Sequence, residues 1–445
     1  MSQKKIYLDY NATTPLESEV ITTITEALTD AWGNPSSSHN TGKTAKGIID
    51  QARSDVASLI GTKSSDVVFT SGGTEADNMI IMTVVKHFNK EKMKNVTEKN
   101  VDQSLTGYIN TESSKKRHHL GEHGCKIGSC DTDEEKYELP HIISSRMEHP
   151  AVNVFLEHLK DTAQAVVTYA SLSPLTGRLE VENVLHEIKP NTILVTVMLA
   201  NNETGIIQPV KEICDAVRNI KRGNGETKKI FVHTDAAQAL GKVPVDVATL
   251  GVDYLTVVGH KYYGPRIGAV YAKDLENRET PLYPFFFGGG QERNFRPGTE
   301  NTGMIAGLGK ASEIAFKNIV KFETDMSKCR DYLEEKLVEA FGKRVHFNGK
   351  FAQSERLPNT CNVSILGNNC EGHKVLAKCK VLQASVGAAC HAQNKPSAIL
   401  LAVGVPEDIA RHALRLSVGR YTTIEDIDLV VEDLKQAVQM LADEA

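Results

Sequence analysis

The clearest pattern in the chain is a series of short apolar runs separated by segments of helix length. From Asp66 to about Lys273 the runs are VVFT (67–70), HIISS (141–145), VVTYA (166–170), TILVTVML (192–199), IFVHT (230–234), YLTVV (254–258) and IGAVYA (267–272). Between them, TEADNMIIMTVVKHF (74–88) has the clearest helical pattern. This alternation predicts an α/β fold with a mostly parallel seven-stranded sheet and helices on both faces.

Two parts of the chain depart from this pattern. Residues from about 89 to 140 are polar and charged, so we expect an inserted, largely flexible surface segment there. After about residue 305 the hydrophobic pattern changes. It predicts helices at 331–342 and 425–441 and strands at 359–366 and 414–420. The second change predicts a smaller α+β domain at the C-terminal end.

Length and composition narrow the function classes. A chain of 445 residues exceeds the roughly 250–300 residues at which one hydrophobic core stops growing, so we expect more than one domain. With 40% hydrophobic and 24% charged residues, the chain is not a wholly disordered protein. A net charge of −5 without a basic stripe argues against nucleic-acid binding. No apolar run reaches the length of a membrane span, so no membrane association is expected.

The cysteines indicate a reducing compartment. All eight occur in a long chain whose N-terminus shows no apolar signal sequence, so we expect free thiols and a cytosolic location. The polar insert holds several potential metal ligands, which are His118, His119, His123, Cys125 and Cys130. Their spacings fit no standard ligand pattern, and a solvated loop is favoured over a metal site.

A glycine-containing turn between a strand and a helix is a candidate anion site. In SGGTEADN (71–78), Gly72 and Gly73 allow close approach of the backbone, and Thr74 adds a hydroxyl donor. The first N–H groups of the following helix have no internal partners and attract a phosphate. The alternative is an ordinary connection in which Thr74 caps the helix.

Three further residues could carry chemistry, and each has a plainer interpretation. Asp235 follows an apolar run and is expected at the carboxyl edge of the sheet, where it could pair with a cationic ring nitrogen or cap a helix. Lys261, in VVGHKYYGP, could lose its proton when desolvated and act as a nucleophile, although most lysines are solvated. Cys390, in SVGAACHAQ, is a reactive or an inert thiol.

These features together match the needs of pyridoxal 5'-phosphate. That cofactor requires an anion site for its phosphate, a lysine for a Schiff base and a carboxylate that keeps its ring nitrogen protonated. Their coincidence in one chain favours the cofactor more strongly than any one of them alone.

The chain resembles the NifS-like pyridoxal-phosphate enzymes of aminotransferase class V over nearly its whole length, except about 89–140. The motifs that carry the resemblance are YLDYNATTPL (7–16), GNPSSSH (33–39), FTSGGTEADN (69–78), EHPAV (148–152), LANNETG (199–205), HTDAAQALGK (233–242), GHKYYGPRIGA (259–269), GGGQERNFRPGTENT (288–302), VGAACH (386–391) and LRLSVGRYTT (414–423). The resemblance implies the type I fold of such transferases, with a large domain at 16–317 and a small domain made of 1–15 and 318–445.

The resemblance also implies roles around the cofactor ring. Lys261 would bind the cofactor covalently and then move the substrate's α-proton, while Asp235 would hold the ring nitrogen protonated. His149 would stack on the ring, and Asn202 and Gln238 would hydrogen-bond its phenolic oxygen.

Other implied roles concern the phosphate and the substrate. The phosphate would be bound by Gly73, Thr74 and His260, and by Thr299 of a neighbouring subunit, which implies a homodimer. Arg415 would bind the substrate carboxylate, and Cys390 would meet its sulfur or selenium atom. The serine that such enzymes commonly carry two residues before the histidine is replaced by Val258, so one phosphate donor is missing.

Within the family, the motifs are most similar to those of enzymes that convert L-selenocysteine to L-alanine and selenide. The implied partners are this substrate and an acceptor protein for the selenide. The alternatives are a cysteine desulfurase that passes sulfur to Cys390 as a persulfide, a plain aminotransferase, and a non-catalytic carrier of selenium or sulfur. Fit alone separates the two chalcogens weakly, because small size differences change binding by only about 1–3 kcal/mol.

Overall fold

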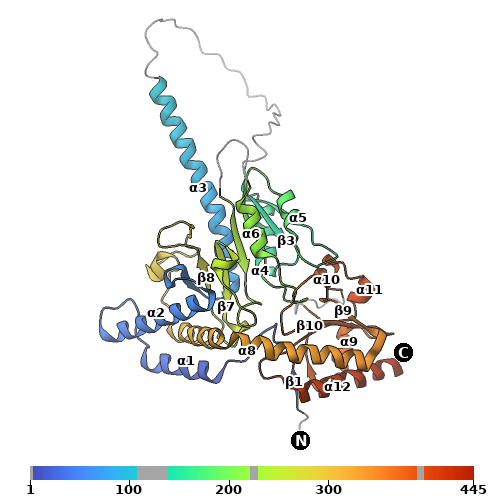
Figure 1. Ribbon diagram of the computed structural model, residues 1–445. Coiled ribbons are helices and arrows are strands. Elements are labelled where there is room, and N and C mark those ends of the chain that lie inside the picture. The colour runs from blue at the N-terminus through green and yellow to red at the C-terminus, as the bar shows by residue number, and fades with distance from the viewer. Residues whose placement is uncertain (1–3, 108–138, 221–228, 388–394, 445) are drawn as a thin grey trace.

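A single seven-stranded sheet forms the centre of the protein (Figure 1). The computed structural model describes residues 4–107, 139–220, 229–387 and 395–444, and only the backbone of 95–107. The strand order is β2-β8-β7-β6-β5-β3-β4, and β8 alone runs antiparallel to its neighbours. The strands are β2 (Val67–Thr70), β3 (His141–Ser145), β4 (Val166–Ala170), β5 (Thr192–Thr196), β6 (Phe231–Asp235), β7 (Tyr254–Val258) and β8 (Gly268–Ala272). The predicted mostly parallel sheet is confirmed, although β5 ends at Thr196, before the predicted end at 199.

Helices cover both faces of the sheet, because successive residues of a strand point to opposite faces and the strands carry apolar side chains on each face. Val67 and Phe69 of β2 join one hydrophobic cluster, and Val68 between them joins the other. The first cluster is covered by α1 (Ser18–Asp30), α2 (Asn40–Ile60), α5 (Val181–His186), α6 (Val210–Arg218), α7 (Val247–Leu250) and the start of α8 (Thr302–Phe341). The second is covered by α3 (Gly73–Gly107) and α4 (Pro150–Asp161).

The helix α3 corrects one expectation from the sequence. It continues to Gly107 and extends away from the body of the protein, so the predicted flexible segment does not begin at residue 89 (Figure 1). The residues after 88 have no apolar face, but many are lysine and glutamate, which have high helix propensity. Lys94 also pairs with Glu91 along the helix, at 3.0 Å. Residues 89–94 are exposed, as their polarity predicts, but they lie in a helix and not in a loop.

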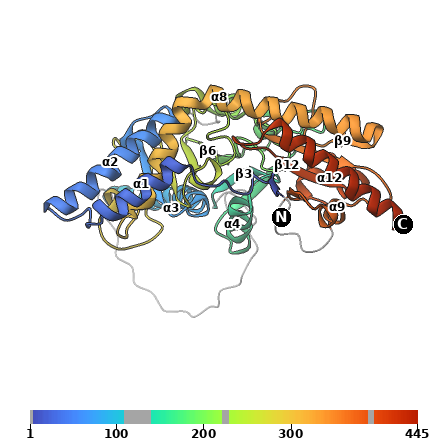
Figure 2. The same ribbon diagram turned by 90° about the horizontal axis from the view of Figure 1, so that it is seen from below.

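The C-terminal part is the predicted smaller α+β unit. Its antiparallel sheet has the order β12-β10-β9, and its remaining helices lie beside it (Figure 2). The elements are β9 (Val345–Phe347), β10 (Thr360–Ile365), α9 (Gly372–Lys378), α10 (Ala398–Ala402), α11 (Glu407–Ala410), β12 (Ala413–Ser417) and α12 (Ile424–Asp443). The helix α8 connects both parts. Its buried residues up to Ala315 belong to the hydrophobic cluster of the large sheet, and those from Met326 onward belong to the cluster of the C-terminal part. The division at 317/318 falls between these two residues and stays a prediction.

The N-terminal segment links the two parts near the sheet edge. The strand β1 (Ile6–Tyr7) pairs with β11 (Leu382–Gln383). The chain then crosses to the large sheet, where the backbone N–H of Thr14 donates to His260 O at 3.0 Å. This crossing places Asn11 and Ala12 beside the residues that follow β7. Among the helices that the structure describes, none is both long and apolar enough to cross a bilayer.

Candidate active site

A cavity of about 360 Å³ lies where the carboxyl ends of the parallel strands meet. The strands β2, β3, β5, β6 and β7 all run in one direction, so the loops that follow them reach the same edge. Nine of the residues expected from the sequence line this cavity, and they are Gly73, Thr74, His149, Asn202, Asp235, Gln238, His260, Lys261 and Arg415. The topology therefore brings together side chains that are up to 342 positions apart.

Lys261 lies in a short turn immediately after β7. Its Nζ donates to the main-chain oxygens of Asn11 at 2.8 Å and Ala12 at 2.9 Å. Burial, the largest cause, and the positive charge of Arg415 together lower the pKa of the Lys261 amine to about 8, against the opposing effect of the carboxylates of Asp235 and Asp9. The uncharged fraction of the amine near neutral pH is therefore much larger than that of an ordinary lysine, and the uncharged form is the nucleophile.

Asp235 is the last residue of β6 and is almost completely buried. Its Oδ1 accepts a hydrogen bond from the Ala237 backbone N–H at 2.8 Å. Burial raises the pKa of this carboxyl, and the backbone hydrogen bond and the nearby His149 and Lys261 oppose the rise. A cationic group in the cavity would stabilise the carboxylate.

His149 caps the start of α4, and its Nδ1 accepts from the Ala151 backbone N–H at 3.1 Å. Burial lowers the pKa of the imidazole, which keeps the ring uncharged. The cap fixes the ring at the cavity wall, where it is available to stack on a flat ligand.

The start of α3 lies at the cavity, where the sequence SGGT predicts an anion site. Gly73 and Thr74 occupy the first turn, whose N–H groups have no partners within the helix. A Cβ on Gly73 would lie 2.6 Å from Cγ2 of Val258, so only glycine fits against that side chain. Val258 also lines the cavity, so an apolar side chain stands at the position where the family resemblance leads us to expect a hydroxyl donor. His260 is held close by, with its Nδ1 at 3.1 Å from Thr13 Oγ1.

The two amide side chains of the site are held differently. Gln238 is fixed at both ends, because its Nε2 donates to Asn11 O at 2.9 Å and its Oε1 accepts from Lys242 Nζ at 2.7 Å. The Oδ1 of Asn202 is buried and has no hydrogen-bond partner within the part of the chain that the structure describes. An unpaired buried oxygen at a cavity wall is expected where a ligand supplies the missing donor.

Arg415 lies on β12 and reaches the cavity from the smaller unit. Its Nη2 forms an ion pair with Asp9 Oδ1 at 2.7 Å, and its Nη1 donates to Asn202 O at 3.0 Å. The Nε is buried and has no hydrogen-bond partner among the described residues. The guanidinium is therefore positioned from two sides at the cavity wall.

Two expected site residues are not placed in this cavity. Thr299 is exposed and is not among the residues that line it. Cys390 lies outside the described residues, as do the histidines and cysteines of the insert. Gly387, three positions before Cys390, does line the cavity.

Sequence reasoning missed four residues at or behind the cavity wall. Asn11, Ala12 and Asp77 line it, and Lys242 lies behind Gln238. Asn11 and Lys242 both stand in motifs that carry the family resemblance, YLDYNATTPL and HTDAAQALGK. The contacts of Asn11 with Gln238 and Lys242, however, join segments far apart in the sequence.

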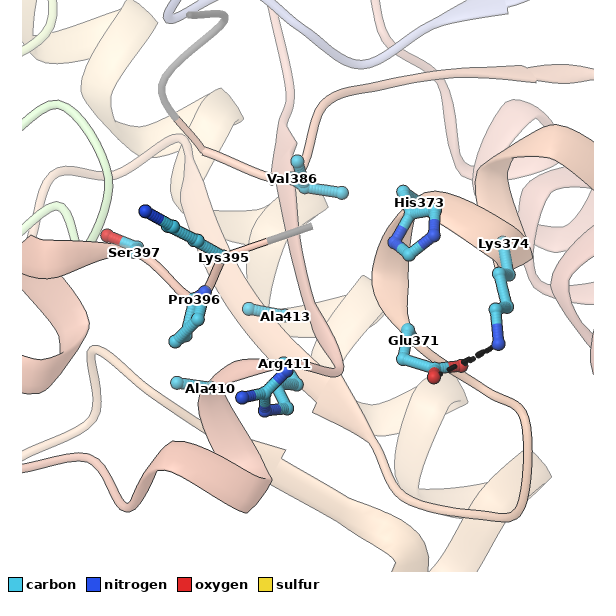
Figure 3. A pocket seen from close by; sticks show the side chains of 10 residues that line it. All are labelled: Glu371, His373, Lys374, Val386, Lys395, Pro396, Ser397, Ala410, Arg411 and Ala413. Carbon is cyan, nitrogen blue, oxygen red and sulfur yellow. Dashed lines mark hydrogen bonds and ion pairs between the residues drawn. The ribbon is translucent and has the colours of Figure 1, made fainter. Parts of the chain in front are cut away.

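A second cavity of about 200 Å³ is lined by a different set of residues, which includes Val386 (Figure 3). Several of its lining residues are basic, including His373, Lys395 and Arg411. Lys374 pairs with Glu371 at 2.9 Å, as the dashed line in Figure 3 indicates. Neither Lys261 nor Asp235 lines this second cavity.

The first cavity fits pyridoxal phosphate. It combines a reactive amine, a buried carboxylate, a helix start for the phosphate and a histidine ring. Two of its residues, Asn202 and Arg415, also have buried polar atoms without a hydrogen-bond partner among the described residues. An empty cavity would leave those atoms unsatisfied, whereas a polar ligand supplies partners for them.

Comparison with known proteins assigns the family. The family model described as Aminotransferase class-V matches residues 6–104 and 135–430. The chain belongs to the class-V aminotransferase family. It is thus a pyridoxal-phosphate-dependent enzyme, and the resemblance read from the sequence motifs is confirmed.

Individual relatives agree with this assignment. The chain is 52% identical to "Selenocysteine lyase" of Homo sapiens over 448 residues, which covers 100% of this chain and 94% of the relative. It is 34% identical to "Cysteine desulfurase IscS" of Methanosarcina thermophila, over 98% of this chain and 93% of that protein. A solved structure called "NIFS-LIKE PROTEIN" superposes with a TM-score of 0.78 at 28% identity, covering 98% of this chain and 100% of that one.

Metal binding has no support in the part of the chain that the structure describes. There, no three histidine, cysteine, aspartate or glutamate side chains come together as a metal-binding group.

Proposed function

We propose that this enzyme converts L-selenocysteine to L-alanine and selenide, with pyridoxal phosphate bound at Lys261. The observation that carries the proposal is the convergence of Lys261, Asp235 and the Gly73 helix start on one cavity. The 52% identity to a selenocysteine lyase over the whole chain supports the choice of substrate, since the desulfurase relative is only 34% identical.

When bound, pyridoxal phosphate supplies an electron sink for negative charge at the substrate's α-carbon. Lys261 Nζ takes the α-proton and returns a proton to the product, which its depressed pKa of about 8 allows near neutral pH. Asp235 keeps a proton on the ring nitrogen. The uncharged His149 ring holds the flat ligand in place and helps to exclude water.

Arg415 orients the substrate by its carboxylate. The guanidinium already has one anionic partner, Asp9, at 2.7 Å, and its Nε is buried without a partner among the described residues. A second carboxylate on Arg415 aligns the amino acid relative to Lys261, because a planar guanidinium binds carboxylates with fixed geometry.

Selenium leaves the β-carbon when the C–Se bond breaks and a C–H bond replaces it. The selenium is left in oxidation state zero, bound to the Cys390 thiol or free, and two electrons from a thiol reductant release it as selenide. A selenol is more acidic and more polarisable than a thiol, so leaving ability and the protonation state of Cys390 favour selenium over sulfur. Cysteine desulfuration through the same residues is the alternative.

We also propose that the working unit is a homodimer. Thr299 is exposed and lies outside its own chain's cavity, which supports a role at the cavity of a second subunit. The side chains of Trp32 and Phe287 are 74% and 85% exposed, so they are accessible for contact with a second chain. Sedimentation at working concentration is expected to give the mass of two chains, and a monomer with full activity would contradict the dimer.

The cytosolic location and the selenide acceptor protein remain part of the proposal. The location is supported by five free cysteines in the described part of the chain, Cys214, Cys329, Cys361, Cys370 and Cys379, since free thiols persist in a reducing compartment.

The deciding experiment measures alanine and the released chalcogen with each amino acid supplied separately. The purified enzyme, loaded with cofactor and given a dithiol reductant, is incubated with L-selenocysteine or with L-cysteine. We expect alanine and selenide from the first and little alanine from the second. Comparable turnover of both would favour the desulfurase, and no alanine from either would contradict both lyase and desulfurase.

A further inference from the structure

Lys242 is a buried amine that the proposed function leaves without a role. Only 4% of the residue is exposed. Its Nζ donates to Gln238 Oε1 at 2.7 Å and to Asn11 Oδ1 at 3.1 Å, and within the described chain it forms no ion pair with a carboxylate. Burial lowers its pKa well below the usual value for lysine, and the positive charges of Lys261 and Arg415 add to the effect.

The contact with Lys242 determines which way the Gln238 amide faces. A glutamine amide has one oxygen that accepts and one nitrogen that donates. Because the N–H groups of Lys242 need an acceptor, the oxygen of Gln238 must face Lys242. The Nε2 then faces the other way, where it donates to Asn11 O at 2.9 Å. A flipped amide would bring donors together at Lys242 and oxygens together at Asn11.

Asn11 extends this arrangement to the reactive amine. Its main-chain oxygen accepts from both Gln238 Nε2 and Lys261 Nζ, at 2.9 and 2.8 Å. Its side-chain Oδ1 accepts from Lys242 and from Asn359 Nδ2, the latter at 3.0 Å. Asn11 is 1% exposed, so these contacts are shielded from water. A change at Lys242 therefore reaches Lys261 through one shared residue.

We propose that Lys242 is a positioning residue of the cofactor site. It holds the Gln238 amide so that Nε2 faces away from Lys242; one N–H of Nε2 donates to Asn11 O, and the other is the donor for an oxygen anion of the cofactor in the cavity that Gln238 lines. Lys242 also holds Asn11, whose carbonyl accepts from Lys261 Nζ. Lys242 is not among the residues that line the cavity, so it acts through its two neighbours. The inference rests on the proposed function in that it takes the cofactor to be bound at Lys261.

The first test replaces the amine by an apolar chain of similar length, in Lys242→Met. We expect the pH at which the absorbance band of the bound cofactor titrates to rise by about one unit, because a lost N–H contact no longer stabilises the deprotonated form. Cofactor affinity should fall several-fold. The matched control is Lys189→Met, since Lys189 is a half-buried lysine that donates to Thr168 Oγ1 at 3.1 Å away from the cavity. An unchanged titration in Lys242→Met would overturn the proposal.

A double-mutant cycle shows whether Lys242 acts through Gln238. In a Gln238→Ala background, Lys242→Met should shift the titration much less than it does alone, whereas additive shifts would contradict the proposed route. If thermal unfolding shows that Lys242→Met does not fold, Gln238→Glu provides the test with Lys242 intact. It keeps an oxygen toward Lys242 and puts a second one toward the cavity. The titration should again move to higher pH, and no movement would contradict the proposal. A wild-type protein without any cofactor band would contradict the proposed function instead.

Discussion

Lys261 Nζ lies 2.8 Å from the main-chain oxygen of Asn11, a residue 250 positions earlier in the chain. The N-terminal segment is thus part of the reaction site, and it holds the amine in the cavity before any ligand arrives. The same segment supplies Asp9, which pairs with Arg415. Arg415 and Asp9, which lie side by side, therefore shift the pKa of the Lys261 amine in opposite directions.

The first prediction concerns the pH dependence of cofactor capture by the apoprotein. Only the uncharged amine attacks the aldehyde, so the rate should rise with pH with a midpoint near the Lys261 pKa of about 8. Arg415→Met removes a positive charge that lowers this pKa, so the midpoint should move to higher pH. Asp9→Asn removes a negative charge that raises it, so the midpoint should move to lower pH. Stopped-flow absorbance measures both, and shifts in one common direction would contradict the electrostatic explanation.

Asp235→Asn should weaken cofactor binding and activity while leaving the fold intact. The neutral amide cannot stabilise a protonated ring nitrogen, and a hydrogen bond to a charged group contributes about 1.5–3 kcal/mol, so we expect a loss of roughly 10- to 100-fold. The control is Asp246→Asn, because Asp246 caps α7 through the Thr249 backbone N–H and asparagine caps equally well. Equal losses in the two variants would remove the special role of Asp235. Equilibrium dialysis and steady-state kinetics give the two quantities.

Gly73→Ala tests the anion site at the start of α3. The new Cβ would lie 2.6 Å from Val258 Cγ2, so the turn must shift and we expect cofactor affinity to fall about tenfold, the scale of a clash of about 1–3 kcal/mol. Gly47→Ala is the control, because Gly47 lies in α2, does not line the cavity, and has no atom within 4 Å of a Cβ at its position. Adding Val258→Ala to Gly73→Ala should restore much of the affinity. No restoration would mean that this contact is not the cause.

Cys390→Ala separates cofactor chemistry from chalcogen handling. The variant should keep the yellow colour of the bound cofactor, since none of the residues that bind it is changed. Turnover of L-selenocysteine should fall to a small fraction of the wild-type rate if the thiol receives the selenium. Full activity in the variant would remove Cys390 from the mechanism. The colour is followed by absorbance and the turnover by alanine release.

The sequence predicted the central sheet well because its strands are short, apolar and bounded by polar segments. The runs at 67–70 and 254–258 match β2 and β7 residue for residue. It failed at α3, where helix propensity continued the helix beyond residue 88 although no apolar stripe marked it. Local patterns thus identify buried elements reliably, but they do not identify a helical segment that lacks an apolar stripe.

The site was predictable as far as residues follow strand ends. Asp235 is the last residue of β6, and Lys261 lies in the turn that follows β7. Because these strands are parallel neighbours, the topology of the sheet brings the two residues together. Asn11 was missed because its contacts arise where the N-terminal segment crosses over the sheet edge. Lys242 contacts Gln238 only four positions away, but its contact with Asn11 depends on the same crossing. No local pattern encodes that crossing, although both residues stand in motifs that carry the family resemblance.

The most direct test of the whole account is reduction of the cofactor-loaded enzyme with borohydride, followed by mass mapping of its peptides. The account predicts a reduced pyridoxal phosphate tag on the peptide that contains Lys261, and its absence from the Lys261→Ala variant. A tag on another lysine, or no tag in the wild-type protein, would contradict it.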